Sequence, residues 1–276
     1  MTNPKLRVVP GSVEDGKRFP DFFCIGPQRT GSTWLHASLV RHPEILMHRD
    51  KETFFFSTIG QTSSPRYKYF LLEDYLDSFR DTPSELILKN YHAMRRCGRF
   101  YTPLIRGEST ASYCVLPDDV LEDLRVLNPD LRIIMLLRDP VERAWSHAKK
   151  DLVRDTGKSA TENQYLHFFS RPDQLARADY SAILERWKAI LKTGHIMLAP
   201  SVRIESDPEG LISDVLSFLG VSWLHAPSKR HLFSRQNPTT GGGIPPRLRS
   251  GLEEILGSQI NAFQVLSANV GKAQII

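Results

Sequence analysis

A short stretch near the start of the chain combines two glycines, an arginine and several hydroxyl side chains. It reads Gly26-Pro-Gln-Arg-Thr-Gly-Ser-Thr33. The apolar run 22–25 predicts a buried strand, and the apolar residues that recur after the loop predict a helix that Ser32 or Thr33 caps. A glycine-bearing turn between a strand and a helix N-terminus directs backbone N–H groups and the positive dipole end to one point. These residues indicate a phosphate site with Arg29 as its cation.

The spacing within this loop leaves the type of phosphate ligand open. Gly26 and Gly31 match the two glycines of the nucleotide-binding P-loop, but that loop continues with lysine, and this chain continues with Ser32. The basic residue is Arg29, two positions before the second glycine. A P-loop kinase or NTPase, which needs Mg²⁺ and the lysine, is one alternative. An ordinary strand–turn–helix with a surface arginine is the other.

A second group of polar residues follows the clearest strand in the sequence, the apolar run 131–137. Arg138 comes directly after this run, Pro140 opens a predicted helix, and Ser146 lies within that helix. An arginine offers a fork of donors to a dianion, and a serine adds a hydroxyl group. Taken alone, the pattern is also typical of a capped helix start with a salt bridge.

Both segments resemble the sulfotransferases that use 3′-phosphoadenosine-5′-phosphosulfate (PAPS). Pro-x-Arg-Thr-Gly-Ser-Thr-Trp-Leu resembles their 5′-phosphosulfate loop, which commonly has lysine in place of Arg29, and Arg138 and Ser146 fall at the spacing of their 3′-phosphate segment. The resemblance implies that Arg138 and Ser146 hold the 3′-phosphate. It implies that Trp34 stacks on adenine, with packing in the core as an equal alternative. The 5′-phosphate would be held by Arg29, Thr30, Gly31, Ser32 and Thr33.

The segment Lys51-Glu-Thr-Phe-Phe-Phe56 follows a predicted strand at 45–47. It resembles the Glu-x-x-Phe-Phe segment of the carbohydrate (heparan-type) sulfotransferases, which implies that Glu52 is the general base. Those enzymes often have a histidine two residues after the glutamate, where this chain has Phe54. The alternative is that Glu52 is solvated or ion-paired with Lys51. The three phenylalanines are expected in the core.

Two weaker matches complete the resemblance. Residues 107–113 look like the Glu-Lys-Thr/Ser-Pro-x-Tyr segment of the family, with Ser109 in place of the lysine; Thr110 and Tyr113 either line the site or pack in the core. A late basic segment resembles the family's loop over the 3′-phosphate end, and its candidate contacts are Lys229 and Arg230. A solvated cluster of charge is the alternative for that segment.

The composition agrees with an enzyme that binds an anion. The chain has 276 residues, 41% of them hydrophobic, and a formal charge of +5. This excess suits an anionic ligand and is too small to favour nucleic acid. The cysteines Cys24, Cys97 and Cys114 are expected to be reduced core thiols. With no apolar run long enough for a membrane span and no secretory pattern, a cytoplasmic enzyme is predicted.

The elements that must position these residues alternate between strands and helices. Besides the strands already named, 196–198 is a predicted strand and the region around 104–113 a strand end and loop. Helices are predicted at 84–96, 117–127, 173–191, 208–219 and 246–266, with a further aromatic helix around 67–79. The alternation predicts an α/β fold with a central parallel sheet flanked by helices, in one domain at 21–276 after a lead-in at 1–20. Ligands of such folds bind outside the carboxyl ends of the strands.

Together these features predict transfer of a sulfonate group from PAPS to a hydroxyl or amine of a carbohydrate or small-molecule acceptor, with release of 3′-phosphoadenosine-5′-phosphate (PAP) and no metal. The P-loop kinase or NTPase and a non-catalytic nucleotide-binding module remain the alternatives. The sequence specifies neither the acceptor nor an oligomeric state.

Overall fold

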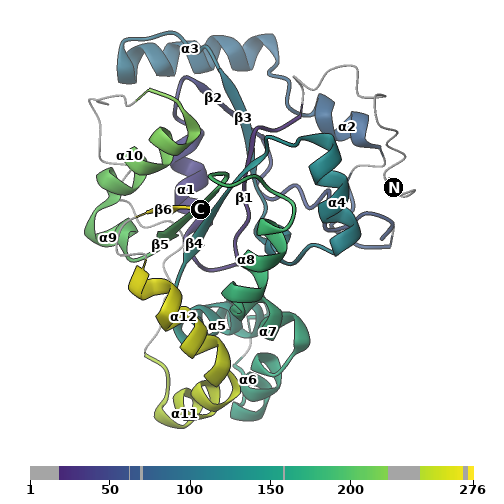
Figure 1. Cartoon of the computed structure of the whole chain (residues 1–276), viewed down its shortest axis with the longest axis vertical. Coiled ribbons are helices and arrows are strands. Elements are labelled where there is room, and N and C mark those ends of the chain that lie inside the picture. The colour runs from purple at the N-terminus through teal and green to yellow at the C-terminus, as the bar shows by residue number, and fades with distance from the viewer. Residues whose placement is uncertain (1–18, 62, 69–70, 158, 223–242, 270–272) are drawn as a thin grey trace.

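The computed structural model describes residues 19–61, 63–68, 71–157, 159–222, 243–269 and 273–276. In this part of the chain, a six-stranded sheet has the order β2-β3-β1-β4-β5-β6 (Figure 1). Five strands run parallel, and β6 is antiparallel to β5, which confirms the predicted mostly parallel sheet. The strands are β1 Phe22–Cys24, β2 Ile45–Met47, β3 Ile105–Ser109, β4 Arg132–Leu137, β5 Ile196–Pro200 and β6 Gln274–Ile275.

The strands are apolar on both sides because helices cover both faces of the sheet. Successive side chains of a strand point to opposite faces. Phe23 and Ile133 therefore enter one hydrophobic core, and Phe22 and Ile134 enter the other. The first face is covered by α4 (Asp118–Leu127), α8 (Tyr180–Lys188) and α12 (Gly257–Asn269). The second is covered by α1 (Ser32–Leu39) and α10 (Pro208–Leu219).

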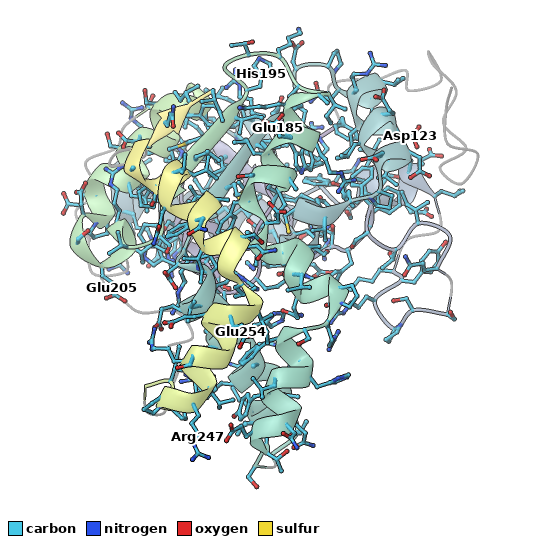
Figure 2. All side chains as sticks on the ribbon, turned by 60° about the horizontal axis from the view of Figure 1, so that its bottom comes forward. Asp123, Glu185, His195, Glu205, Arg247 and Glu254 are labelled. Carbon is cyan, nitrogen blue, oxygen red and sulfur yellow. The ribbon has the colours of Figure 1, made fainter. Side chains whose placement is uncertain are left out.

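A smaller helical layer lies beside the sheet and forms a third apolar cluster. Its helices are α5 (Pro140–Ala148), α6 (Glu162–Phe169), α7 (Pro172–Ala178) and α11 (Pro246–Ile255), and a π-helical segment η2 (Lys149–Arg154) continues α5. Helix α12 packs against both α8 and α5 and so joins this layer to the sheet (Figures 1 and 2). Contacts with α12 and with the other helices of this layer therefore fix the position of α5, which carries Ser146.

Several predicted boundaries were wrong, each for a local reason. The helix predicted at 173–191 is broken at Asp179, whose side chain accepts a hydrogen bond from Ala182 N and so starts a new helix, α8. The helix predicted at 246–266 is broken at Leu256, which separates α11 from α12. The aromatic helix shrinks to α2 (Leu72–Asp77). Phe19, placed in the lead-in, is buried and packs against Phe23 and Phe56.

The remaining elements follow their sequence signals closely. Helix α3 (Pro83–Cys97) begins with a capping box between Thr82 and Glu85 and ends at Gly98 in the left-handed conformation. The 3₁₀ turn η1 (Ala111–Val115) follows β3, and the short helix α9 (Arg203–Ser206) follows β5. No helix in the described ranges combines the length and apolarity that a membrane crossing requires.

Candidate active site

The loop between β1 and α1 is tight because two of its glycines have close neighbours. Gly26 has φ 88°, and a Cβ atom there would lie 2.4 Å from the Ala111 carbonyl oxygen. Gly31 has φ 104°, and its Cβ would lie 2.2 Å from Ile204 Cδ1. Both positions therefore require glycine. Arg29 adopts φ 72°, a conformation that is uncommon for a residue with a side chain and is often found at functional sites.

The N-terminus of α1 lacks a side-chain cap, contrary to the prediction that Ser32 or Thr33 caps it. Gly31 is the N-cap residue. The hydroxyl of Ser32 accepts a hydrogen bond from Lys51 Nζ at 3.3 Å, and the hydroxyl of Thr30 donates to the Pro27 carbonyl at 2.9 Å. The positive end of the helix dipole is therefore not neutralised by a capping side chain, which is the arrangement that favours an anion.

The two predicted phosphate-binding segments meet directly. Arg29 Nε donates to Ser146 Oγ at 2.9 Å, and Arg138 Nη1 donates to the Arg29 carbonyl at 2.9 Å. Arg138 is held in turn by Tyr180, whose buried hydroxyl donates to the Arg138 carbonyl at 2.7 Å. Residues 117 positions apart in the sequence thus share one hydrogen-bonded group at the carboxyl ends of β1 and β4.

This group concentrates positive charge. Burial lowers the pKa of Arg29, and the neighbouring guanidinium groups of Arg154 and Arg138 lower it further, against the opposing effect of Asp151 and Asp155. The pKa of Lys149 is also lowered, first by burial and then by Arg138 and Arg29, although Glu142 opposes this. Protonated side chains that lie close together are stabilised when an anion binds between them. The hydrogen-bonded group of Arg29, Ser146 and Arg138 therefore suits a phosphate.

Glu52 lies on the other side of the phosphate loop. It follows β2, and its Oε1 is 3.5 Å from Lys51 Nζ, so the ion pair considered from the sequence is present. Lys51 also donates to Ser32, which joins the carboxylate to the N-terminus of α1. The side chain of Glu52 is 17% exposed. Lys51 is a candidate site residue that the sequence analysis did not predict; its position beside Glu52 in the segment after β2 was the available signal.

The phenylalanines after Glu52 fall into two groups. Phe55 and Phe56 are buried, as predicted for core residues. Phe54 is only partly buried, adopts φ 58°, and lies under the guanidinium of Arg66 at 4.9 Å from the ring centroid. The residue that replaces the family's histidine thus stands in a strained conformation close to Glu52.

A buried carboxyl group supports the segment that carries Glu52. Thr53 Oγ1 donates to Glu108 Oε2 at 2.5 Å, and Thr53 N donates to Thr110 Oγ1 at 3.1 Å. Burial raises the pKa of Glu108 to about 7, against the hydrogen bonds from Thr53, Tyr113 and Tyr75. Thr110 and Tyr113 are themselves buried, so they support the segment that carries Glu52 from the protein interior and do not line an open surface.

The other predicted residues have different outcomes. Trp34 is 3% exposed and lies in the core on the α1 face of the sheet, the packing role left open above. Lys229 and Arg230 lie outside the described residues. Thr33 is half-buried in the first turn of α1. The three cysteines are unpaired; Cys24 and Cys114 are buried, whereas Cys97, predicted to be in the core, is only half-buried.

The comparisons with known proteins agree with this geometry. A profile described as the sulfotransferase family matches residues 20–225. The chain belongs to the sulfotransferase family. This sulfotransferase is 26% identical over 214 residues to bifunctional heparan sulfate N-deacetylase/N-sulfotransferase 4 of Mus musculus, an alignment that covers 74% of the chain and 22% of the relative. Against the membrane-associated sulfotransferase kil1 of Dictyostelium discoideum it is 30% identical over 127 residues, 46% of the chain and 22% of the relative. The chain thus spans about a fifth of the length of these relatives.

Solved structures share the fold of this sulfotransferase. A crystal structure of a sulfotransferase from Alicyclobacillus acidocaldarius superposes with a TM-score of 0.62 at 20% identity, over 90% of this chain and 95% of that one. Mouse sulfotransferase SULT7A1 complexed with PAP superposes with a TM-score of 0.51 at 14% identity, over 91% and 88% of the two chains. At these identities the likeness establishes the fold, a single sheet with helices on both faces.

Proposed function

We propose that this protein transfers a sulfonate group from PAPS to a hydroxyl or amine of a carbohydrate acceptor and releases PAP. The observation that carries the proposal is the junction of Arg29, Ser146 and Arg138, because it puts two phosphate-binding segments in contact at one edge of the sheet. Family membership supports the reaction class. The heparan sulfate N-sulfotransferase names of the relatives support a carbohydrate acceptor and, for its nucleophile, an amine.

The residues present fit a nucleotide with a phosphate at each end. The uncapped N-terminus of α1 and Arg29 suit the 5′-phosphate, and Arg138 with Ser146 suits the 3′-phosphate. The lowered pKa of Arg29, caused first by burial and then by the neighbouring guanidinium groups of Arg154 and Arg138, supports this assignment, since like charges gathered without an anion are costly. Lys229 and Arg230 remain candidates for the 3′-phosphate end.

When bound, PAPS supplies a sulfonate group attached to a phosphate that can leave. Glu52 accepts the proton of the acceptor hydroxyl or amine at a carboxylate oxygen. Lys51 and Arg29 hold positive charge where the leaving phosphate gains negative charge. Thr110 holds the backbone of Thr53 and Glu108 holds its side chain, so that Glu52, the preceding residue, keeps its place beside the loop.

The proposal is tested by transfer from PAPS labelled in its sulfonate group. The purified chain is incubated with sugars that carry a free hydroxyl or a free amine, and labelled product is counted. Glu52→Gln should keep the affinity for PAP within a few-fold of wild type and lower kcat by about 10²–10⁴. Glu122→Gln, an exposed carboxylate on α4, serves as the matched control with full activity.

Each contrary outcome has a definite meaning. Full activity of Glu52→Gln would show that Glu52 is not the base. Binding of PAP without transfer to any acceptor would favour the non-catalytic nucleotide-binding module. Thermal stabilisation by ATP with Mg²⁺, without stabilisation by PAP, would favour the P-loop kinase or NTPase.

A further inference from the structure

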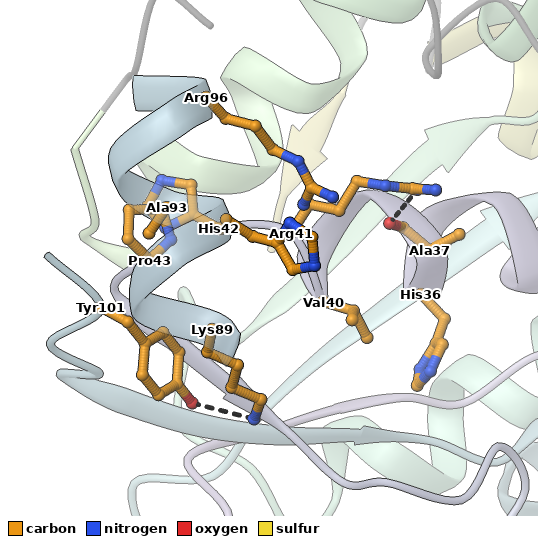
Figure 3. A pocket seen from close by; sticks show the side chains of 11 residues that line it. His36, Ala37, Val40, Arg41, His42, Pro43, Lys89, Ala93, Arg96 and Tyr101 are labelled. Carbon is orange, nitrogen blue, oxygen red and sulfur yellow. Dashed lines mark hydrogen bonds between the residues drawn. The ribbon is translucent and has the colours of Figure 1, made fainter. Parts of the chain in front are cut away.

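A cleft of about 350 Å³ lies between the end of α1 and helix α3, away from the loops described above. Figure 3 shows the side chains that line it. Those that carry the argument are His36, Arg41, Lys89, His92, Arg96 and Tyr101. The volume is at the lower end of the range for small-molecule sites, which corresponds to a single sugar unit.

Positive charge in the cleft is not balanced by its own lining. Among the residues that the structure describes, no aspartate or glutamate lines it. The pKa of Arg41 is lowered by burial and by the guanidinium of Arg96. In the described ranges, no carboxylate lies within ion-pair distance of Arg41 or Arg96, and Arg41 uses one donor on the Ala37 carbonyl at 2.6 Å. The remaining donors of two neighbouring guanidinium groups can therefore bind an oxyanion.

Unlike Arg41 and Arg96, Lys89 has an ion-pair partner in the part of the chain that the structure describes. Its Nζ is 2.5 Å from Asp81 and 3.3 Å from the Tyr101 hydroxyl, so its charge is balanced. Lys89 and Tyr101 form a fixed polar wall of the cleft, and the ammonium group also lies over the Tyr101 ring at 4.8 Å. The unbalanced charge is confined to the arginine side, where Figure 3 shows Arg41 and Arg96 close to each other.

The inner end of the cleft reaches toward the transfer site. His36 lies one helical turn after Ser32 on α1, and its buried Nδ1 has no hydrogen-bond partner among the described residues. Burial, together with the nearby charges of Lys51 and His48, lowers the pKa of His36 to about 4. A neutral imidazole in the lining lets a sugar approach this end of the cleft without adding charge.

We propose that this cleft is a second anion site, which binds a sulfate or phosphate ester carried by a sugar. The ester oxygens contact Arg41 and Arg96, and the sugar extends toward His36. The site is separate from the nucleotide phosphates, because α1 has its N-terminus at the phosphate loop and its last turn at the cleft. The ester belongs either to an acceptor or to an independent sugar ester.

The test measures binding of glucose 6-sulfate by isothermal titration calorimetry at low ionic strength, with PAP at saturation so that the nucleotide phosphate sites are filled. Arg41→Gln and Arg96→Gln should each weaken binding about tenfold or more, because each removes a charge-assisted hydrogen bond. Arg95→Gln is the matched control, since Arg95 is exposed on the same helix and contacts Tyr91 instead of the cleft. It should bind like wild type.

Further measurements distinguish a sugar ester from inorganic sulfate, and an ester on the acceptor from an independent sugar ester. Tighter binding of glucose 6-sulfate than of inorganic sulfate supports a sugar ester, and equal binding would overturn the sugar part of the proposal. Product formation that rises when a sulfated acceptor replaces its neutral counterpart, and that loses this preference in Arg96→Gln, assigns the ester to the acceptor. An unchanged preference in Arg96→Gln assigns it to an independent sugar ester.

Three results would overturn the site itself. These are no binding by wild type at millimolar glucose 6-sulfate, equal weakening in Arg95→Gln, and equal affinity for uncharged glucose. Unchanged affinity for PAP in the arginine variants shows that they are folded. If the chain does not bind PAP at all, the proposed function fails, but the same titration without PAP still tests the cleft.

Discussion

Replacing Glu108 with glutamine should remove a pH dependence from the stability of the protein. The carboxyl group is fully buried, and its pKa is raised from 4.5 to about 7. Between these two values the folded chain retains a proton that the unfolded chain has lost, so the free energy of unfolding of wild type falls as pH rises and levels off above about 7. At 1.36 kcal/mol per pKa unit, the loss is about 3 kcal/mol. The glutamine variant does not titrate and should not show this loss.

The measurement is urea unfolding of both proteins at several pH values between 4.5 and 8. Because other groups titrate equally in the two proteins, the difference between their unfolding free energies isolates Glu108. As pH rises from 4.5 to 8, this difference should change by about 3 kcal/mol in favour of the variant. Glu44→Gln is the control. Burial raises the pKa of Glu44, but the hydrogen bonds from Ser222 outweigh this and lower it, so its effect should have the opposite sign and appear only at acidic pH. Parallel curves for wild type and Glu108→Gln would refute the reasoning.

Three further predictions concern the residues proposed to bind phosphate and Tyr180, which contacts one of them. Arg29→Ala should lower turnover about 100-fold or more, and wild-type turnover in that variant would exclude a role for Arg29 in catalysis. Arg138→Ala should weaken PAP by about 1.5–3 kcal/mol and adenosine 5′-phosphosulfate, which lacks the 3′-phosphate, much less; equal weakening in calorimetry would indicate a structural role. Tyr180→Phe, which removes the 2.7 Å hydrogen bond to the Arg138 carbonyl, should lower the unfolding free energy by about 1 kcal/mol in urea, and an unchanged urea midpoint would show that this bond contributes nothing.

The sequence predicts strands β1, β2, β4 and β5 well because each contains a continuous apolar run. The runs 131–137 and 22–25 are examples, and both place polar residues at the carboxyl edge. The two-residue strand β6 was not predicted, since so short a segment gains its hydrogen bonds only from β5, far away in the chain. Asp179 broke a helix through its own side chain, a local signal that the helical periodicity around it obscured.

The candidate site was predicted less completely, for a related reason. The residues around Arg29 belong to one local motif, whereas the hydrogen bond between Thr53 and Glu108 joins two segments that are 55 positions apart. Likewise, the contact of Lys51 with Ser32 depends on β1 and β2 both flanking β3. Contacts of this kind arise from the order of the strands, which the alternation of strands and helices does not specify.

The hydrogen bond from Arg29 to Ser146 makes the serine an internal competitor for the arginine. If Arg29 and Ser146 hold the two phosphates as proposed, a ligand that has only a 5′-phosphate must break this bond and gains nothing at the other end, whereas a ligand with both phosphates replaces it at both partners. The free state therefore favours doubly phosphorylated nucleotides over AMP before any base contact is made. The same bond can re-form as the nucleotide product departs, so it lowers the free energy of the emptied site and favours release over retention.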